Sequence, residues 1–324
     1  MRHLLSISDL TREEILRIFA LSTDLKAKFL EGVREPLLPG RVMALLFEKP
    51  SLRTRVSFEA GMAHLGGTTL VLGSEAGFGH RESIADFTRV LSEMVDVIVV
   101  RSKRHATVEE VASHASCSVI NGLTDHSHPC QALADLFTLS EHLGSLAGAK
   151  LAWVGDANNV ARSLALACGR LGVEMVVAAP SDYQFSAAEV ARLQSQEPQL
   201  QLSLTDDPRE AVADATAVYT DVWTSMGQEA EMAERIEAFT PFQLNAKLLS
   251  HAANHCKVLH CLPARRGEEI TDEVIDGPHS AIMDQAGNRM HAQKGLLLWL
   301  AIQHKQLDPA VLESEGIELP LGIS

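Results

Sequence analysis

Short apolar runs alternate with longer amphipathic segments along the first half of the chain, after a helix predicted over residues 11–29 with Ser8 and Asp9 as candidate caps. The predicted strands cover residues 42–47, 68–72, 95–101 and 118–121. The predicted helices between and after them cover residues 53–65, 83–94, 107–115 and 128–142. Apolar strands that alternate with amphipathic helices favour a parallel sheet covered on both faces.

The segment LGSLAG at residues 143–148 separates this half from a second alternation of the same kind. Its predicted strands cover residues 150–155, 174–179, 202–205, 217–221 and 257–260, and its predicted helices cover residues 160–171, 186–196 and 208–213. A last helix is predicted over 293–307, and the tail over 308–324 is expected to be irregular. We therefore expect an α/β protein with two doubly wound parallel-sheet domains, residues 1–146 and 147–290, and a C-terminal part, residues 291–324, whose helix packs back on the first domain.

Length and composition agree with two soluble domains. The chain has 324 residues, of which 46% are hydrophobic and 22% are charged. It shows no basic and apolar N-terminal leader, and its apolar runs fall short of a membrane span. We therefore expect a cytoplasmic protein.

Charge and cysteine usage exclude several function classes. A formal net charge of −14 disfavours nucleic acid or an anionic membrane as a partner. The five cysteines are odd in number and form no C-x-x-C pair, which argues against a disulfide framework and a zinc knuckle. They are interpreted as reduced thiols.

Polar clusters follow many of the predicted strands. In an open parallel sheet, ligands bind beyond the carboxyl ends of the strands, so these clusters are candidate site residues. They lie at residues 51–55, 101, 121 with 128–131, 155–159, 221–227 and 260–263. Taken together, they indicate one active site in the cleft between the two domains.

The stretch FEKPSLRTR, residues 47–55, indicates an anion site where a strand gives way to a helix. Free backbone N–H groups at a helix start, the helix dipole and the guanidinium groups of Arg53 and Arg55 all favour a bound phosphate. The alternative is an ordinary capped helix start with two surface arginines. The residues alone leave both interpretations open.

Other clusters have equally ordinary alternatives. The turn GDANN, residues 155–159, lacks the glycines of a dinucleotide fingerprint, and its amide side chains suggest a polar or zwitterionic ligand instead. His128 could simply cap a helix that starts at Pro129. Cys261 could be a buried thiol, and Asp221 could form a turn.

Read in order, these motifs resemble the transcarbamylases and, within them, the ornithine carbamoyltransferases. The resemblance covers nearly the whole chain. It rests on FEKPSLRTR, HPCQALADL, GDANNVARSL, DVWTSMGQE, HCLPARRGEEITDEVIDG and NRMHAQKGLL, which come in family order and spacing. The HPCQ and S-x-R-T-R motifs are typical of carbamoyl phosphate binding, and the pairing of DVWTSMG with HCLP is more specific for ornithine as acceptor.

The resemblance implies a function and a set of site residues. The reaction is the attack of the ornithine δ-amine on carbamoyl phosphate, giving citrulline and phosphate, with no metal and no other cofactor. The catalytic residues would be Arg101, His128, Asp221 and Cys261. Carbamoyl phosphate would be bound by Ser51, Leu52, Arg53, Thr54, Arg101, His128, Gln131, Cys261, Leu262 and Arg289. Ornithine would be bound by Asn159, Asp221, Ser225 and Met226.

The family also implies a homotrimer or a multiple of trimers, in arginine biosynthesis or in the catabolic deiminase pathway. Two departures concern the phosphate site: Leu52 stands where family members often have Thr, and Gly77 stands where many have Gln or His, with His80 as a possible substitute. Arg162 and Arg265 replace frequent His residues. Rival hypotheses are a transcarbamylase for N-acetyl- or N-succinyl-ornithine or putrescine, a non-catalytic homologue that binds carbamoyl phosphate or an amino acid, and a nucleotide-binding dehydrogenase.

Overall fold

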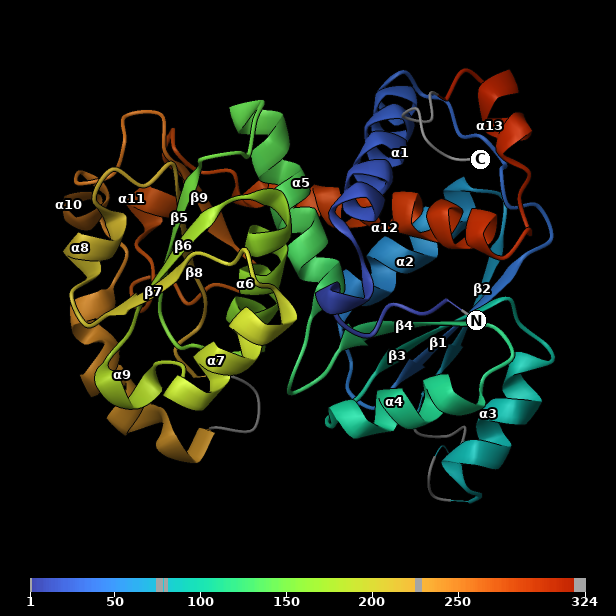
Figure 1. Cartoon of the computed structure of the whole chain (residues 1–324), viewed down its shortest axis with the longest axis horizontal. Coiled ribbons are helices and arrows are strands. Elements are labelled where there is room, and N and C mark those ends of the chain that lie inside the picture. Colours follow the sequence, from blue (N-terminus) through green and yellow to red (C-terminus); the bar gives the residue numbers. More distant parts are fainter. Residues whose placement is uncertain (1, 74–77, 79–80, 225–228, 318–324) are drawn as a thin grey trace. The chain divides into compact units, whose positions relative to one another are not determined.

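The computed structural model describes residues 2–73, 78, 81–224 and 229–317. The chain divides into two compact units: unit 1 comprises Met1–Ala134 with Gly287–Ser324, and unit 2 comprises Asp135–Ala286. Each unit contains one parallel sheet flanked by helices, which confirms the predicted α/β fold class (Figure 1).

Unit 1 is built on a four-stranded parallel sheet with the order β2-β1-β3-β4. The strands are β1 (Val42–Phe47), β2 (Thr68–Leu72), β3 (Val97–Arg101) and β4 (Ser118–Leu123). The helices are α1 (Arg12–Leu30), α2 (Leu52–His64), α3 (Ile84–Ser92) and α4 (His105–His114). Helices α3 and α4 cover one face of the sheet and α1 and α2 lie on the other, so both faces are buried as the apolar strand sequences require (Figure 1).

The start of α1 differs from the sequence expectation. Thr11 caps the helix in a capping box with Glu14, whose carboxylate accepts a hydrogen bond from the backbone N–H of Thr11. Ser8 and Asp9, the caps expected from the sequence, lie in a separate short 3-10 helix, Ile7–Asp9. The predicted caps were therefore wrong, because a capping box at Thr11 satisfies the first turn better than residues two or three positions earlier.

Unit 2 contains a five-stranded parallel sheet with the order β7-β6-β5-β8-β9. Its strands are β5 (Lys150–Val154), β6 (Glu174–Ala178), β7 (Leu202–Thr205), β8 (Ala217–Thr220) and β9 (Lys257–His260). Its helices include the part of α5 (Pro129–Leu143) from Asp135 onward, α6 (Asn159–Leu171), α7 (Ala187–Gln196) and α8 (Pro208–Val212), together with α9 (Met232–Phe239), α10 (Ala246–Leu249) and α11 (Asp272–Ile275). The last three were not expected from the sequence.

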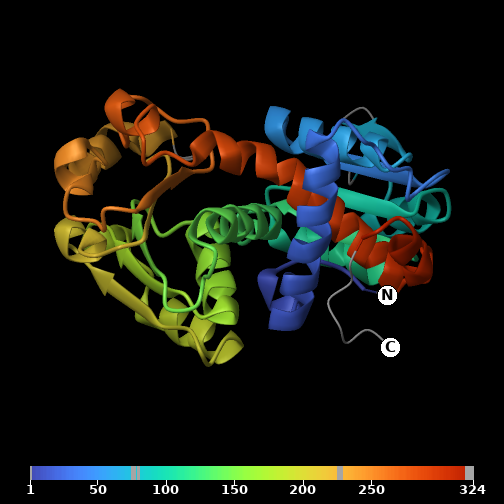
Figure 2. The same cartoon turned by 90° about the horizontal axis from the view of Figure 1, so that it is seen from above.

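The C-terminal part contains more helix than the pattern predicted. Helix α12 (Ile282–Gln303) begins well before residue 293, and a further helix, α13 (Pro309–Ser314), lies in the tail that was expected to be irregular. The early part of α12 was missed because it buries polar residues such as Gln285, Asn288 and Arg289, which blur the apolar period. Within unit 1, α12 packs tightly on α1, as a Cβ on Gly295 would lie only 2.3 Å from Ser22 Oγ (Figure 2).

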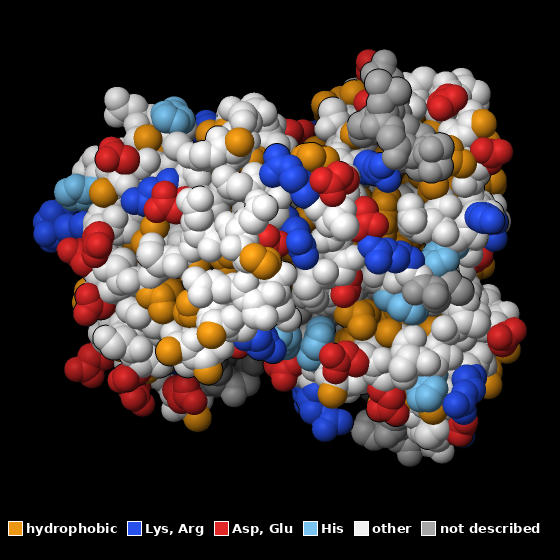
Figure 3. Space-filling view, viewed as in Figure 1, with side chains coloured by type: hydrophobic (Ala, Val, Ile, Leu, Met, Phe, Trp, Pro, Cys, Tyr) orange, Lys and Arg blue, Asp and Glu red, His pale blue; other side chains and the backbone are white. Residues whose placement is uncertain are grey.

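The surface is mixed in charge. On the face drawn in Figure 3, acidic and basic side chains are interspersed, and hydrophobic side chains appear in small patches. Among the described residues, no helix is both long enough and apolar enough to span a membrane.

Candidate active site

The first turn of α2 carries the predicted phosphate ligands. Ser51 is the N-cap: its Oγ accepts a hydrogen bond from the backbone N–H of Thr54 at 3.4 Å and donates one to Thr54 Oγ1 at 3.0 Å. The N–H groups of such a turn, at the positive end of the helix dipole, attract an anion. Leu52, the first residue of the helix, is 75% exposed, so its hydrocarbon side chain lies in solvent and only its backbone can serve a ligand.

Two buried guanidinium groups converge on Thr54. Arg101, the last residue of β3, donates from Nη1 to Thr54 Oγ1 at 3.4 Å, and Arg289 on α12 donates from Nη2 to the same atom at 3.3 Å. Arg289 also donates from Nη1 to Gln131 Oε1 at 2.6 Å. The Nε of Arg101 is buried and has no hydrogen-bond partner among the described residues. An unused donor beside concentrated positive charge is what a bound oxyanion would satisfy.

Electrostatics in this group agree with an anion site. Burial, followed by repulsion from Arg289 and Arg53, lowers the pKa of Arg101 to about 10. His128, just before Pro129 at the start of α5, is also buried, and burial together with Arg289 and Arg101 holds its pKa well below the ordinary value. His128 is therefore a neutral imidazole at neutral pH, able to donate one hydrogen bond to a ligand without adding charge.

One arginine suggested by the sequence motif lies elsewhere. Arg55 is exposed on α2 and pairs with Glu59 at 3.2 Å, one turn further along the same helix. The structure therefore pairs Arg55 with Glu59 and does not bring it to Thr54, because Arg53 and Arg55 are two positions apart and point to different faces of the helix. The guanidinium groups at Thr54 come from Arg101 and Arg289, which are distant in sequence.

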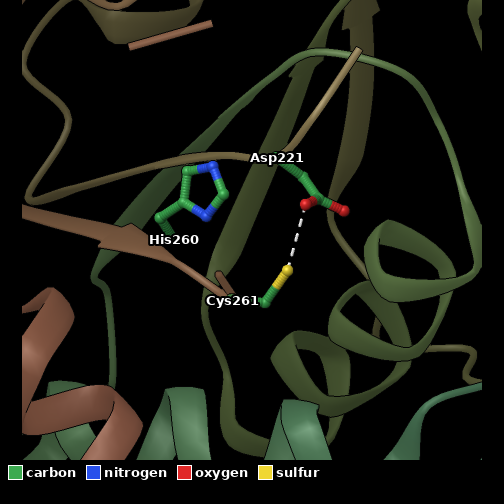
Figure 4. Close-up of side chains that lie close together, drawn as sticks. All are labelled: Asp221, His260 and Cys261. Carbon is green, nitrogen blue, oxygen red and sulfur yellow. Dashed lines mark hydrogen bonds between the residues drawn. The ribbon is translucent and has the colours of Figure 1, made fainter. Parts of the chain in front are cut away.

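In unit 2, Asp221 is held by three partners directly after β8. Its Oδ2 accepts a hydrogen bond from Asn158 Nδ2 at 2.9 Å, and its Oδ1 accepts from the backbone N–H of Val222 at 2.8 Å and from Cys261 Sγ at 3.0 Å (Figure 4). The sequence named Asn158 only as part of the GDANN turn and gave it no role of its own. Asn158 also caps α6 through Oδ1, so the same side chain fixes the helix start and the carboxylate, whereas the predicted Asn159 is the first residue of that helix.

Cys261 differs from the other thiols. Cys117, Cys130, Cys168 and Cys256 are buried, and burial raises the pKa of each of them. Cys261 is only partly buried and donates its S–H proton to a carboxylate. It is the thiol of this chain that a ligand can approach.

His260 and Glu269 form a buried pair behind Cys261; the sequence placed His260 in a polar cluster without a role, and Glu269 was not named. Both are 0% exposed, and His260 Nε2 lies 3.1 Å from Glu269 Oε1. Nδ1 of His260 accepts a hydrogen bond from the backbone N–H of Leu262 at 2.8 Å, which assigns the proton to Nε2. Leu262 has a φ of 59°, unusual for a bulky residue, and the hydrogen bond to His260 stabilises this turn. The pair therefore shapes the backbone beyond Cys261.

Asp221, His260 and Cys261 also lie close enough together to be tested as metal ligands, with their ligand atoms within 4.8 Å of one another. The donor set does not fit a resident ion. Cys261 Sγ already bonds Asp221 (Figure 4). The two ring nitrogens of His260 already face Leu262 N and Glu269. A metal ion would have to displace these protein partners, so no catalytic step is assigned to a metal.

Ser225 and Met226, and also Gly77 and His80, lie outside the described residues. Arg162 pairs with Glu189 at 2.5 Å on the side of α6, and the backbone N–H of Arg265 donates to Glu269 Oε1 at 2.6 Å.

Two family models match the chain and place it among the carbamoyltransferases, in agreement with its two α/β units. Residues 2–141 match the carbamoyl-P binding domain of aspartate/ornithine carbamoyltransferase. Residues 147–300 match the Asp/Orn binding domain of the same family. The chain therefore belongs to the aspartate/ornithine carbamoyltransferase family.

Individual relatives extend this result over almost the full length. The chain is similar to an ornithine carbamoyltransferase from Carboxydothermus hydrogenoformans, with 49% identity over 92% of this chain and 97% of the relative. It is also 49% identical to one from Bacillus subtilis, over 91% of this chain and 92% of the relative. Among solved structures, ornithine carbamoyltransferase from Pyrococcus furiosus matches with a TM-score of 0.88 and 48% identity, over 91% of this chain and 96% of that one.

Proposed function

We propose that the protein transfers the carbamoyl group of carbamoyl phosphate to the δ-amine of L-ornithine, giving L-citrulline and phosphate. The observation that carries this proposal is the convergence of Arg101 and Arg289 on Thr54 at a helix start, with neutral His128 near both arginines. This group offers hydrogen-bond donors and positive charge to a phosphate dianion and a carbonyl oxygen. The names of the relatives support ornithine as the acceptor.

The donor is assigned to unit 1. Ser51, Arg53, Thr54 and the backbone N–H of Leu52 would hold the phosphate, while Arg101, His128, Gln131 and Arg289 would contact the carbamoyl end. As the amine attacks the carbamoyl carbon, the carbonyl oxygen gains negative charge, and donors fixed in a desolvated place stabilise that charge. The C–O bond to phosphate then breaks, and the cationic helix start stabilises the departing phosphate.

The acceptor is assigned to unit 2. Asp221 would bind the α-ammonium group of ornithine together with Asn159, and Ser225 and Met226 would complete the amino-acid site. The attacking δ-amine must be neutral, so a proton has to leave it. We assign orientation of the amine and receipt of this proton to the hydrogen-bonded Asp221–Cys261 pair, with Cys261 and Leu262 next to the reacting carbon.

A steady-state assay tests the proposal directly. The enzyme is supplied with carbamoyl phosphate and, in turn, L-ornithine, N-acetyl-ornithine, N-succinyl-ornithine and putrescine. We expect L-ornithine to have the highest kcat/KM, because acylation or loss of the α-amino acid group removes the ammonium that Asp221 would pair with. Faster carbamoylation of another amine, or no turnover of any, would overturn the proposal.

Replacing Cys261 with Ser tests the role of the thiol. The hydroxyl keeps a donor to Asp221 but titrates far above the physiological range, so ornithine kinetics and their pH profile should change while carbamoyl phosphate affinity stays nearly the same. Ornithine kinetics identical to those of the wild type would exclude Cys261 from proton handling.

We further propose a homotrimer, or a multiple of trimers, in the cytoplasm, acting in arginine biosynthesis or in the catabolic deiminase pathway. Exposed apolar side chains on unit 1 support self-association: Leu52 and Val56 on α2 and Leu70 on β2 are 75%, 50% and 48% exposed. Sedimentation equilibrium tests the oligomeric state, and a monomer would contradict the proposed trimer.

As domain boundaries we propose residues 1–146 for carbamoyl phosphate and 147–290 for ornithine, with 291–324 returning to the first domain.

A further inference from the structure

Gln285, in the first turn of α12, is a buried amide that uses both of its ends. It is 0% exposed. Its Oε1 accepts a hydrogen bond from the backbone N–H of His260 at 2.8 Å, and its Nε2 donates to Asp135 Oδ1 at 2.6 Å and to Tyr219 Oη at 3.1 Å. A backbone N–H can only donate and a carboxylate can only accept, so the orientation of this amide is fixed by its partners.

Two partners of Gln285 lie in the chain just before the candidate catalytic residues of unit 2, Asp221 and Cys261. His260 ends β9 and precedes Cys261, while Tyr219 on β8 lies two residues before Asp221. β8 and β9 are neighbours in the sheet, with Thr220 opposite His260. One side chain therefore bonds to both strands just upstream of the two atoms, Asp221 Oδ1 and Cys261 Sγ, that lie 3.0 Å apart.

The outer edge of β9 explains why an amide is needed at this point. β9 is the last strand of its sheet, so its outward N–H groups need partners from outside the strands. The N–H of Val258 donates to the backbone carbonyl of His279 at 2.8 Å, and two residues later the N–H of His260 donates to Gln285. Gln285 thus replaces a backbone partner at the last position before the site.

Asp135 fixes Gln285 in turn. It lies on α5, is 0% exposed, and its Oδ1 faces the amide nitrogen of Gln285. Tyr219 is also fully buried, with its ring stacked on Trp153 at a centroid distance of 4.8 Å, and burial together with Asp135 raises its pKa well above the ordinary value. The Tyr219 hydroxyl is therefore protonated, and the network around Gln285 is built from rigidly packed groups.

We propose that Gln285, oriented by Asp135, is a positioning residue that sets the Asp221–Cys261 geometry. The effects on ornithine kinetics that follow from this inference rest on the proposed function. Gln285 touches neither substrate in this assignment and acts only through the ends of β8 and β9.

The test inverts the polarity of the Gln285–Asp135 bond. In Gln285→Glu, the carboxylate still accepts from His260 N–H but opposes the carboxylate of Asp135. We expect KM for L-ornithine to rise about tenfold with little change in carbamoyl phosphate affinity, because a buried hydrogen bond is replaced by repulsion between two carboxylates. In the double variant Asp135→Asn with Gln285→Glu, the new amide donates to the new carboxylate, and KM should return to within about twofold of the wild type.

The dependence of kcat/KM for ornithine on pH distinguishes a positioning role of Gln285 from a purely structural one. In the single variant, the two carboxyl groups share one proton at low pH and repel each other once it is lost, so kcat/KM for ornithine should fall as pH rises, relative to the wild type. The double variant should lose this dependence. Gln184→Glu is a matched control, because Gln184 Nε2 bonds two backbone carbonyls, those of Ala179 and Thr205, in the part of the chain that the structure describes, and this change should lower stability without moving KM or the profile.

A second readout does not depend on the reaction. The rate of alkylation of Cys261 by iodoacetamide, followed by peptide mass spectrometry against pH, reports the environment of the thiol even if the chain does not turn over ornithine. We expect a changed rate in Gln285→Glu and recovery in the double variant. Unchanged Cys261 reactivity and ornithine KM in a folded Gln285→Glu protein, or a double variant that fails to recover while its melting temperature does, would overturn the inference. If the wild type does not transfer the carbamoyl group, but Cys261 reactivity still changes in Gln285→Glu and recovers in the double variant, only the proposed function is overturned.

Discussion

The two groups of site residues are built on opposite principles. Around Thr54 in unit 1, Arg101 and Arg289 bring positive charges together in a desolvated place, and Arg101 keeps a buried donor unused within the described part of the chain. Around Asp221 in unit 2, the carboxylate already has Asn158, Val222 and Cys261 as partners. The first group leaves a donor that a ligand could satisfy, whereas the carboxylate of the second group already has protein partners and, under the proposed function, orients the substrate.

The largest effect should come from removing a charge in unit 1. In Arg101→Met we expect kcat to fall on the order of 10²–10³-fold, because a fixed donor to the developing oxyanion is lost. Steady-state kinetics with both substrates measure this. Arg55→Met is the matched control: Arg55 is exposed and pairs with Glu59, so its loss should change kcat less than twofold. Equal effects of both variants would mean that the unit 1 cluster does not act on the substrate.

A change in unit 2 should affect the other substrate. In Asp221→Asn, the new amide nitrogen faces the amide of Asn158, and the charge that pairs with an ammonium is gone. We expect KM for L-ornithine to rise about a hundredfold, while carbamoyl phosphate affinity stays within about twofold. Asp206→Asn, at an exposed position of the same unit, serves as the control. A comparable loss of carbamoyl phosphate binding in Asp221→Asn would remove the division of labour between the units.

The local positive charge around the buried His291 of unit 1 should appear as acid sensitivity. Burial and the neighbouring Lys294 and Lys26 lower the pKa of His291 to about 3. Below pH 6.5 the unfolded chain binds a proton there that the folded chain does not, so this residue reduces stability by about 1.4 kcal/mol per pH unit as pH falls from 6.5 toward 3.

Urea unfolding of wild type and His291→Gln at pH 7 and pH 5 measures this difference. We expect the wild type to lose about 2 kcal/mol more than the variant over this interval. The exposed His255→Gln variant should follow the wild type. If His291→Gln loses stability as steeply as the wild type, the imidazole is not held neutral.

The smallest effect should come from Leu52. Because this side chain lies in solvent, Leu52→Thr should leave KM for carbamoyl phosphate within about twofold, whereas Ser51→Ala, which removes the helix cap, should raise it. Initial rates at varied carbamoyl phosphate measure both. A large gain in affinity in Leu52→Thr would show that the hydroxyl missing from this chain matters.

Most of the fold could be predicted from the chain because apolar strands buried on both faces leave a plain pattern. Strands at residues 42–47, 68–72, 202–205 and 257–260 were predicted with the bounds that the structure gives. The prediction missed the start of α12, where polar residues are buried in hydrogen bonds and interrupt the apolar pattern. It also missed α9–α11, which are too short to show a full apolar period.

The sequence by itself determined the alternation of strands and helices, the helix start at Ser51 and the positions of Asp221 and Cys261, because these depend on local pattern and motif. Only the tertiary structure decided which arginines share Thr54, that Asn158 holds Asp221, and that Gln285 ties β8 to β9. These contacts join residues 25 to 235 positions apart in the chain, and their geometry follows from packing rather than from any local preference.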